Sequence, residues 1–277
     1  MFFEVRKLIS TGQIDAAEIM LREIVSSSKD PFLRIQCAST LLVIGRGVAS
    51  EDVLYDLYED LSEYEGDIFP IAQAMRGLGR ADLAVELLAD MEKNDDELRE
   101  YALSLNINGR FNESVEVIHT IKSQNLSDKI LAVDSYSSMG RYEEAMELSD
   151  LLYKEAPEDY GVLRSRSAAL ISSGRDKEAV KFARSLLKAD KNSANANAVT
   201  AYVMHVIGNT KPAGAFSSKA LRADPSHVGA MEILALSLME KGKFGNASIV
   251  AGAMNEKEPG NPAAVRILKE CGGRMDQ

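Results

Sequence analysis

The chain has 277 residues, of which 45% are hydrophobic and 27% charged, a composition that excludes disordered and collagen-like classes. Its formal net charge of −10 disfavours nucleic-acid binding, because neutralising phosphates requires clustered Lys and Arg. Its two cysteines, Cys37 and Cys271, lie far apart and form no CxxC motif, so we expect neither a disulfide scaffold nor a zinc site. We also expect that the protein resides in a reducing compartment.

The charge is unevenly spread along the chain. Residues 1–156 carry 30 acidic and 15 basic side chains, whereas residues 157–277 carry 12 acidic and 17 basic ones. The first part is therefore strongly negative and the second weakly positive. Two interpretations stay open: the asymmetry steers a partner or a second copy of the chain, or acidic helix faces only aid solubility.

The N-terminus indicates neither secretion nor a membrane anchor. It reads MFFEVRKLIS, in which Glu4, Arg6 and Lys7 interrupt the apolar run, and no small-residue cleavage site follows. No segment approaches the run of about 18 apolar residues that a membrane-spanning helix needs. We therefore expect a cytoplasmic protein that does not contact a membrane.

Glycine recurs at intervals of 30 to 34 residues along the chain. The positions are Gly12, Gly45, Gly79, Gly109, Gly140, Gly174, Gly208 and Gly242. A period of this size is typical of stacked helical repeats. Each glycine is expected to adopt the left-handed conformation that ends one helix before an antiparallel second helix begins. The sequence thus predicts about eight helix pairs over residues 1–260 and almost no β-structure.

Small and large residues keep a constant distance from these glycines. Most repeats have a small residue seven positions before the glycine: Ala38, Ala72, Ala102, Ser167, Ala201 and Ala235, with Val5 and Val133 as exceptions. Most also have a small residue five positions after it: Ala17, Ala84, Ser114, Ala145, Ala179, Ala213 and Ala247. We expect the small residues where paired helices cross, because they let two backbones approach closely. A large apolar residue or Tyr stands four before each glycine and should fill the space between repeats.

In chain order, the repeats differ in regularity. Those in residues 1–127 are degenerate: the second reads GRGVASEDVLYDLYEDL with extra turn residues, and the next two are short and lack proline. Those in residues 128–260 are clearer, as in GRYEEAMELSDLLYKEAP, and proline ends three second helices, at Pro157, Pro225 and Pro259.

A final helix is expected over residues 261–272. Pro262 suits its first turn, Gly272 and Gly273 are expected to end it, and its polar outer face would cap the stack. Because adjacent repeats bury one another, the sequence predicts a single repeat array over residues 1–277, with no domain boundary.

Small, large, Gly, Ala and Pro at these spacings resemble tetratricopeptide repeats over nearly the whole chain. The resemblance implies an all-α solenoid, a right-handed superhelix whose concave face binds proteins or peptides. The family's first-helix Trp is absent throughout. Its carboxylate clamp requires Asn directly after the small first-helix residue, and Ser39, Gln73, Leu103, Asp134, Ala168, Tyr202 and Leu236 stand there instead. That particular site is therefore not expected here.

The concave face remains the best candidate for a site. The repeat register predicts that Gln73, Arg76, Arg99, Leu103, Asn106, Asp134, Arg164, Ala168, Ile171, Tyr202, His205, Glu232 and Leu236 line it. Among these we expect partner contacts from Arg76, Arg99, Asn106, Asp134, Arg164, Tyr202 and His205, because Arg and Tyr are favoured where interfaces bind tightly. The alternative is that they are ordinary solvated residues of the groove.

No other motif indicates chemistry. The segment Gly45-Arg46-Gly47 superficially resembles a nucleotide-binding loop, but the third glycine is absent. His119, His205 and His227 lie in separate repeats without an HExxH motif, and no GxSxG motif exists. We therefore expect no catalysis, no metal and no cofactor.

An acidic run forms the rival surface. It consists of Glu51, Asp52, Asp56, Glu59, Asp60, Glu63, Glu65 and Asp67 and is expected on one helix, either as a patch for a basic partner or as a solvated convex face.

The sequence thus predicts a protein- or peptide-binding adaptor or assembly scaffold. Two alternatives stay open: an accessory subunit of an enzyme, or an enzyme without an obvious motif, and a self-associating repeat protein that forms a homodimer.

Overall fold

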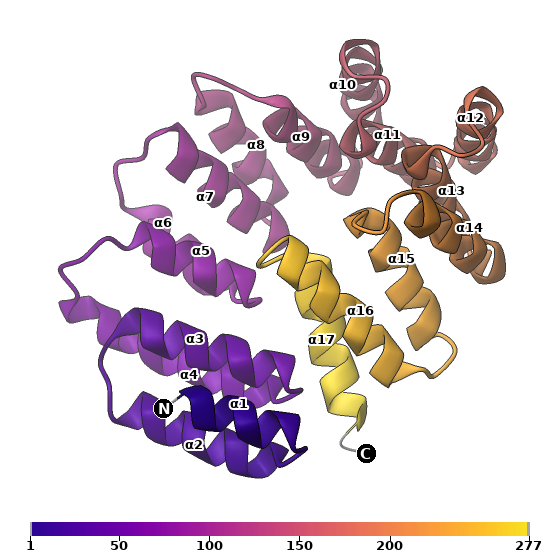
Figure 1. The fold of residues 1–277 in the computed structure, drawn as a ribbon. Helices are drawn as coiled ribbons and strands as arrows, with labels where there is room; N and C mark the ends of the chain where they lie inside the picture. Colours follow the sequence, from indigo (N-terminus) through magenta and orange to yellow (C-terminus); the bar gives the residue numbers. More distant parts are fainter. Residues whose placement is uncertain (1, 276–277) are drawn as a thin grey trace. The chain divides into compact units, whose positions relative to one another are not determined.

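The structure is a computed structural model that describes residues 2–275. These residues form seventeen α-helices and one short 3-10 helix, with no β-strand in that range (Figure 1). The helices pair as the glycine period predicts. The pairs are α1 Phe2–Ser10 with α2 Ile14–Ser26, α3 Pro31–Val43 with α4 Gly47–Asp60, α5 Phe69–Gly77 with α6 Ala81–Ala89, α7 Asp95–Ile107 with α8 Phe111–Thr120, α9 Leu126–Ser138 with α10 Tyr142–Glu155, α11 Tyr160–Ser172 with α12 Asp176–Ala189, and α13 Ala194–Val206 with α14 Thr210–Ala223. Helices α15 Val228–Met239 and α16 Phe244–Lys257 follow each other in the chain, joined by the turn at Gly242. The 3-10 helix η1 is Leu61–Glu63, and α17 is Pro262–Met275.

The turn inside each pair is closed by its glycine. All eight periodic glycines have positive φ, between 69° and 85°, which a residue with a Cβ rarely adopts. At seven of these turns the next residue donates its backbone N–H to the carbonyl five residues earlier, as Arg46 does to Leu41 at 2.8 Å. This hydrogen bond satisfies a carbonyl at the end of the first helix. The prediction that glycine ends each first helix is confirmed.

The small residues of the repeat lie in the core. Every residue named above at seven before or five after the glycine is completely buried, including Ser114 and Ser167. The hydroxyl of Ser114 donates to the carbonyl of Ala102, on the paired helix, at 2.8 Å. Small side chains therefore occupy the helix crossings, as the period predicts.

The contacts divide the chain into two compact units. Unit 1 consists of Met1–Asp90 together with Lys243–Gln277, and unit 2 is Met91–Gly242. Unit 2 is continuous in sequence, whereas unit 1 is assembled from both ends of the chain. Whether residues 1–277 fold as a single body stays a prediction.

Within unit 1, α17 packs along α16 and also contacts α3 and α4. The expectation that Gly272 and Gly273 end this helix is wrong, because α17 continues through both to Met275. A Cβ at Gly272 would lie 2.7 Å from the carbonyl oxygen of Gly45, so glycine serves close packing there and not termination. Among the described residues, no helix is both long and apolar enough to cross a bilayer.

Candidate functional site

Three of the side chains expected on the first-helix face meet in unit 2. Asp134 comes from α9, Arg164 from α11 and Tyr202 from α13. Arg164 Nη2 donates to Asp134 Oδ2 at 2.6 Å, and the Arg164 guanidinium carbon lies 5.9 Å from the centre of the Tyr202 ring. Ser165 Oγ donates to the other carboxylate oxygen of Asp134 at 3.0 Å. We call the first three residues the Asp134–Arg164–Tyr202 cluster.

The electrostatics of this cluster keep its arginine charged. Burial by itself lowers the pKa of Arg164, but the Asp134 carboxylate and the Tyr202 and Tyr160 side chains outweigh it, so the pKa stands above its ordinary value. Burial raises the pKa of Tyr202, although the nearby Arg164 cation opposes that shift. At neutral pH Arg164 is therefore charged and Tyr202 is a neutral phenol. The Arg164 side chain as a whole is 30% exposed.

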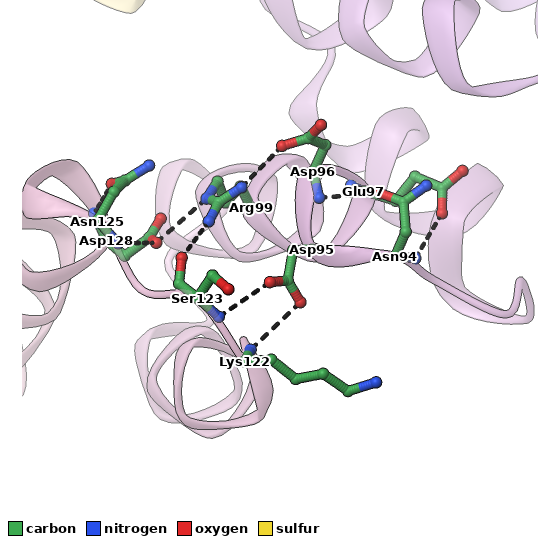
Figure 2. A network of polar contacts seen from close by, with 9 residues as sticks. All are labelled: Asn94, Asp95, Asp96, Glu97, Arg99, Lys122, Ser123, Asn125 and Asp128. Atoms are coloured by element: carbon green, nitrogen blue, oxygen red, sulfur yellow. Dashed lines mark hydrogen bonds and ion pairs between the residues drawn. The ribbon is translucent and has the colours of Figure 1, made fainter.

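Arg99, another expected contact residue, is engaged inside the chain (Figure 2). Its guanidinium donates to Asp128 Oδ2 at 3.1 Å, to Asp96 Oδ1 at 2.7 Å and to the carbonyl of Ser123 at 2.5 Å. The hydrogen bond to Asp128 is the largest of the effects that raise the pKa of Arg99. These bonds join α7 to the segment before α9 and to the first turn of α9, so Arg99 positions one repeat on the next.

The same network includes two helix caps that the sequence analysis missed. Asn94 accepts from the N–H of Glu97 at 3.1 Å while Glu97 accepts from the N–H of Asn94 at 2.7 Å, and Asn125 and Asp128 repeat this capping box at the start of α9. Figure 2 also shows Asp95 accepting from two backbone N–H groups, which lower its pKa. The spacing of Asn with an acid three residues later is the sequence signal for these caps.

The other expected contacts in unit 2 also bridge neighbouring repeats. Asn106 Nδ2 donates to Ser135 Oγ at 2.7 Å, and His205 Nδ1 lies 3.6 Å from Glu240 Oε1. The rest of the predicted set in this unit is partly buried on first helices: Leu103, Ala168, Ile171, Glu232 and Leu236. The predicted residues of this unit thus all lie on first helices, and most of the polar ones pair inside the chain.

In unit 1, Arg76 faces the turn between α16 and α17. Its Nη1 donates to the carbonyl of Gly260 at 3.4 Å. Beside this contact lies an open pocket of about 370 Å³. Its lining includes Ile35, Ser39 and exposed Gln73 from first helices and Pro259 from the turn.

The segment resembling a nucleotide loop is an ordinary repeat turn. Arg46 pairs with Asp15 at 2.6 Å and with Glu18 at 2.9 Å, both on the preceding repeat. Gly45 has positive φ, as the other turn glycines do. Within residues 2–275 no group of three or more His, Cys, Asp or Glu side chains is placed to hold a metal ion.

The acidic run does not lie on one helix as expected. Helix α4 ends at Asp60, so Glu65 and Asp67 fall beyond it. Several of its acids have basic partners, such as Asp60 with Arg34 at 2.6 Å.

Both cysteines are buried. Burial raises the pKa of the Cys37 thiol to about 11 and also raises that of Cys271. Neither thiol is therefore poised as a nucleophile at neutral pH.

Consecutive helices joined by left-handed glycines, with buried small residues seven before and five after them, are the features that the chain shares with known helical repeats. The chain resembles tetratricopeptide-repeat proteins. No protein-family model and no curated protein sequence matches it. In tetratricopeptide-repeat terms, α9, α11 and α13 are the first helices of successive repeats.

Solved structures with a similar arrangement include a tetratricopeptide repeat protein from Parabacteroides merdae, with 16% identity, a TM-score of 0.49, and 85% of this chain and 96% of that one covered. A thermophilic TPR protein from Thermus thermophilus has 14% identity and a TM-score of 0.45, covering 65% and 99%. YrrB, described as a TPR protein with an unusual peptide-binding site, has 13% identity and a TM-score of 0.35, covering 65% and 95%.

Proposed function

We propose that the protein is a protein- or peptide-binding scaffold and that the Asp134–Arg164–Tyr202 cluster carries its main contact. The supporting observation is that three successive first helices bring a carboxylate, a charged guanidinium and a phenol together on one face. A bound segment that crosses this face would contact several repeats at once, which is how an extended peptide gains affinity.

The chemistry of the cluster favours an acidic or carboxyl-terminal segment as ligand. Arg offers a planar fork of donors that matches a carboxylate, and Tyr adds apolar area with a polar tip. The positive balance of residues 157–277 supports an acidic ligand near Arg164 and Tyr202, whereas the negative balance of residues 1–156 disfavours one near the N-terminal repeats.

The function is tested by removing both charges of the cluster together, so that neither is left without its partner. Arg164→Gln with Asp134→Asn does this and leaves the net charge unchanged, and replacing both partners together limits the loss of stability. Arg184→Gln with Asp176→Asn makes the same pair of changes on the exposed surface of α12 and is the matched control.

Proteins captured on the wild-type chain are identified by mass spectrometry and then rebound as purified partners or as their C-terminal peptides. We expect the cluster variant to lose about tenfold or more in affinity while the control binds as wild type. Equal binding by all three chains, with helical signals intact, would show that the contact lies elsewhere, and α4 with its acidic residues would become the next candidate.

Self-association is a second candidate, and exposed apolar side chains in unit 1 favour it. Phe3, Ile19, Val48 and Ile249 are 61–81% exposed, although large aliphatic and aromatic groups are usually covered. Light scattering across a concentration series tests this, with Ile19→Ser and Val48→Ser as variants. A wild-type chain that stays monomeric at every concentration would exclude a homodimer of useful stability.

A further inference from the structure

The turn between α16 and α17 sits on the first helices of the second and third repeats. Arg76 on α5 donates to the carbonyl of Gly260 in this turn, and Pro259 and Asn255 line the pocket next to it. The contact joins residues 184 positions apart in the sequence. A segment from the C-terminal part of unit 1 therefore lies on a surface built by its N-terminal part.

The surface under the turn consists of groove positions. Ile35 and Ser39 stand three before and one after the small residue Ala38 of α3, and Gln73 stands one after Ala72 of α5. These are the offsets that the repeat register assigns to the partner-binding face. The turn thus occupies, within the same chain, the place that a bound peptide would take on these repeats.

The close packing of the α16–α17 turn on α5 requires a glycine in the turn and a glycine on α5. A Cβ added at Gly260 would lie 2.6 Å from the Cα of Gly77, and a Cβ added at Gly77 would lie 3.0 Å from the Cα of Gly260. Gly260 also has a φ of 76°, which disfavours any other residue. Whatever occupies this surface must therefore present a glycine with a carbonyl within reach of Arg76.

The hairpin of α16 and α17 is held at a different place from the pocket. Lys269 Nζ contacts Glu51 Oε1 at 2.6 Å, and Gly272 packs against the backbone of Gly45. Val265, Lys269 and Gly272 are spaced four and three residues apart, so they share one face of α17. This face can be altered without changing any residue that lines the pocket.

We propose that the face of α3 and α5 around Arg76 is a second binding surface, closed in cis by the α16–α17 turn. It accepts in trans a segment with a Pro-Gly turn, in which glycine packs on Gly77 and its carbonyl accepts from Arg76. Because a tethered occupant acts at an effective concentration of roughly millimolar, a partner must compete with it, and releasing the hairpin strengthens binding. This surface is independent of the Asp134–Arg164–Tyr202 cluster.

The test uses the full chain with the hairpin loosened from outside the pocket. The release variant combines Lys269→Glu, which places a like charge beside Glu51, with Gly272→Ala, which pushes against Gly45. The control combines Lys243→Glu, at the exposed N-terminal end of α16, with Gly273→Ala, where an added Cβ meets nothing within 4 Å. The two variants have the same charge change and the same gain in helix propensity.

Hydrogen exchange over α17 measures release, and fluorescence anisotropy measures binding of a labelled peptide with the sequence of residues 254–261, MNEKEPGN. We expect faster exchange of α17 in the release variant alone, and peptide affinity about tenfold or more above that of wild type and control. The same peptide with Ala in place of its glycine should not bind.

Three results would overturn the proposal: unchanged protection of α17 in the release variant, equal affinity of all chains for the peptide, or equal binding of the Ala peptide. If the release variant loses its helical signal, Gly272→Ala alone is compared with Gly273→Ala alone under the same criteria. None of these outcomes depends on whether the Asp134–Arg164–Tyr202 cluster binds a partner.

Discussion

The arginine that follows the turn glycine pairs locally in unit 2 and at Arg80 of unit 1, which binds Asp82, whereas Arg46 of unit 1 binds another repeat. In unit 2, Arg110, Arg141 and Arg175 each pair with the glutamate three residues later on their own helix. In unit 1, Arg46 reaches back to Asp15 and Glu18 of the preceding repeat. The reason is local: three residues after Arg46 stands buried Ala49, which offers no carboxylate.

The same contrast extends to how the repeats are joined. In unit 2, polar bonds connect consecutive first helices across 29 to 31 residues, as between Arg99 and Asp128 or between Arg164 and Asp134. In unit 1, Lys269 and Glu51 meet across 218 residues. The same glycine turn therefore occurs in a unit joined by contacts between neighbouring repeats and in a unit joined by contacts between distant parts of the chain. Unit 2 can form from neighbouring repeats, whereas unit 1 is complete only when residues from the far end of the chain return.

The largest expected effect tests the core of unit 2. Leu152 on α10 is 1% exposed in a cluster with Val133 and Ala169, so Leu152→Ala leaves a cavity and should lower the free energy of unfolding by about 2–5 kcal/mol. Its neighbour Leu151 is 60% exposed, and Leu151→Ala should change stability little. Denaturant titration gives the free energy of unfolding of both variants.

Hydrogen exchange on the Leu152→Ala variant then tests the prediction of a single repeat array. That prediction requires residues 2–90 and 243–275 to lose protection together with unit 2 and not separately.

Overpacking a helix crossing comes second. Ala201 on α13 is completely buried with Ala213 and Ile233, so Ala201→Leu should cost about 1–3 kcal/mol of stability. Ala223→Leu, on the exposed end of α14, is the control. If both variants melt at the wild-type temperature, the close crossing inferred for Ala201 is wrong.

The bridging arginine of unit 1 comes third. Arg46→Gln removes charge-assisted bonds to two carboxylates of the preceding repeat and should cost about 1–2 kcal/mol, since its side chain is only 22% exposed. Thermal unfolding at low and high salt measures the loss. A cost no larger than that of the next variant would remove the contrast between the units.

The smallest effect is expected from the same change in unit 2. Arg141→Gln breaks an exposed pair with Glu144 on one helix, and such pairs contribute little. Hydrogen bonding to Arg141 lowers the pKa of Glu144 from its ordinary 4.5. The contribution of the pair is therefore present above pH 4.5 and is lost as the pH falls below it. Wild type should melt slightly above the variant at neutral pH, and this small difference should shrink at pH 3.

The amino-acid sequence by itself determined the helix pairs, their turns and their buried small residues. These follow from local sterics: only glycine adopts the left-handed turn readily, and only small side chains fit where two helix backbones cross. The capping boxes at Asn94 and Asn125 were also within reach, because their signal spans four residues. The turn glycines repeat every 30 to 34 residues, so their pattern is visible without any alignment.

Only the tertiary structure decided which side chains pair and where the chain ends pack. The repeat register placed Arg99, Arg164 and Tyr202 on the same face of their first helices. Whether each side chain pairs inside the chain depends on the distances between helices, which a local sequence pattern does not specify. Gly272 was expected to end a helix and instead permits close contact with Gly45, because glycine serves both purposes and the sequence letter is the same. The contact between Arg76 and Gly260 left no sequence signal, since its partners lie 184 residues apart and meet only when unit 1 is complete.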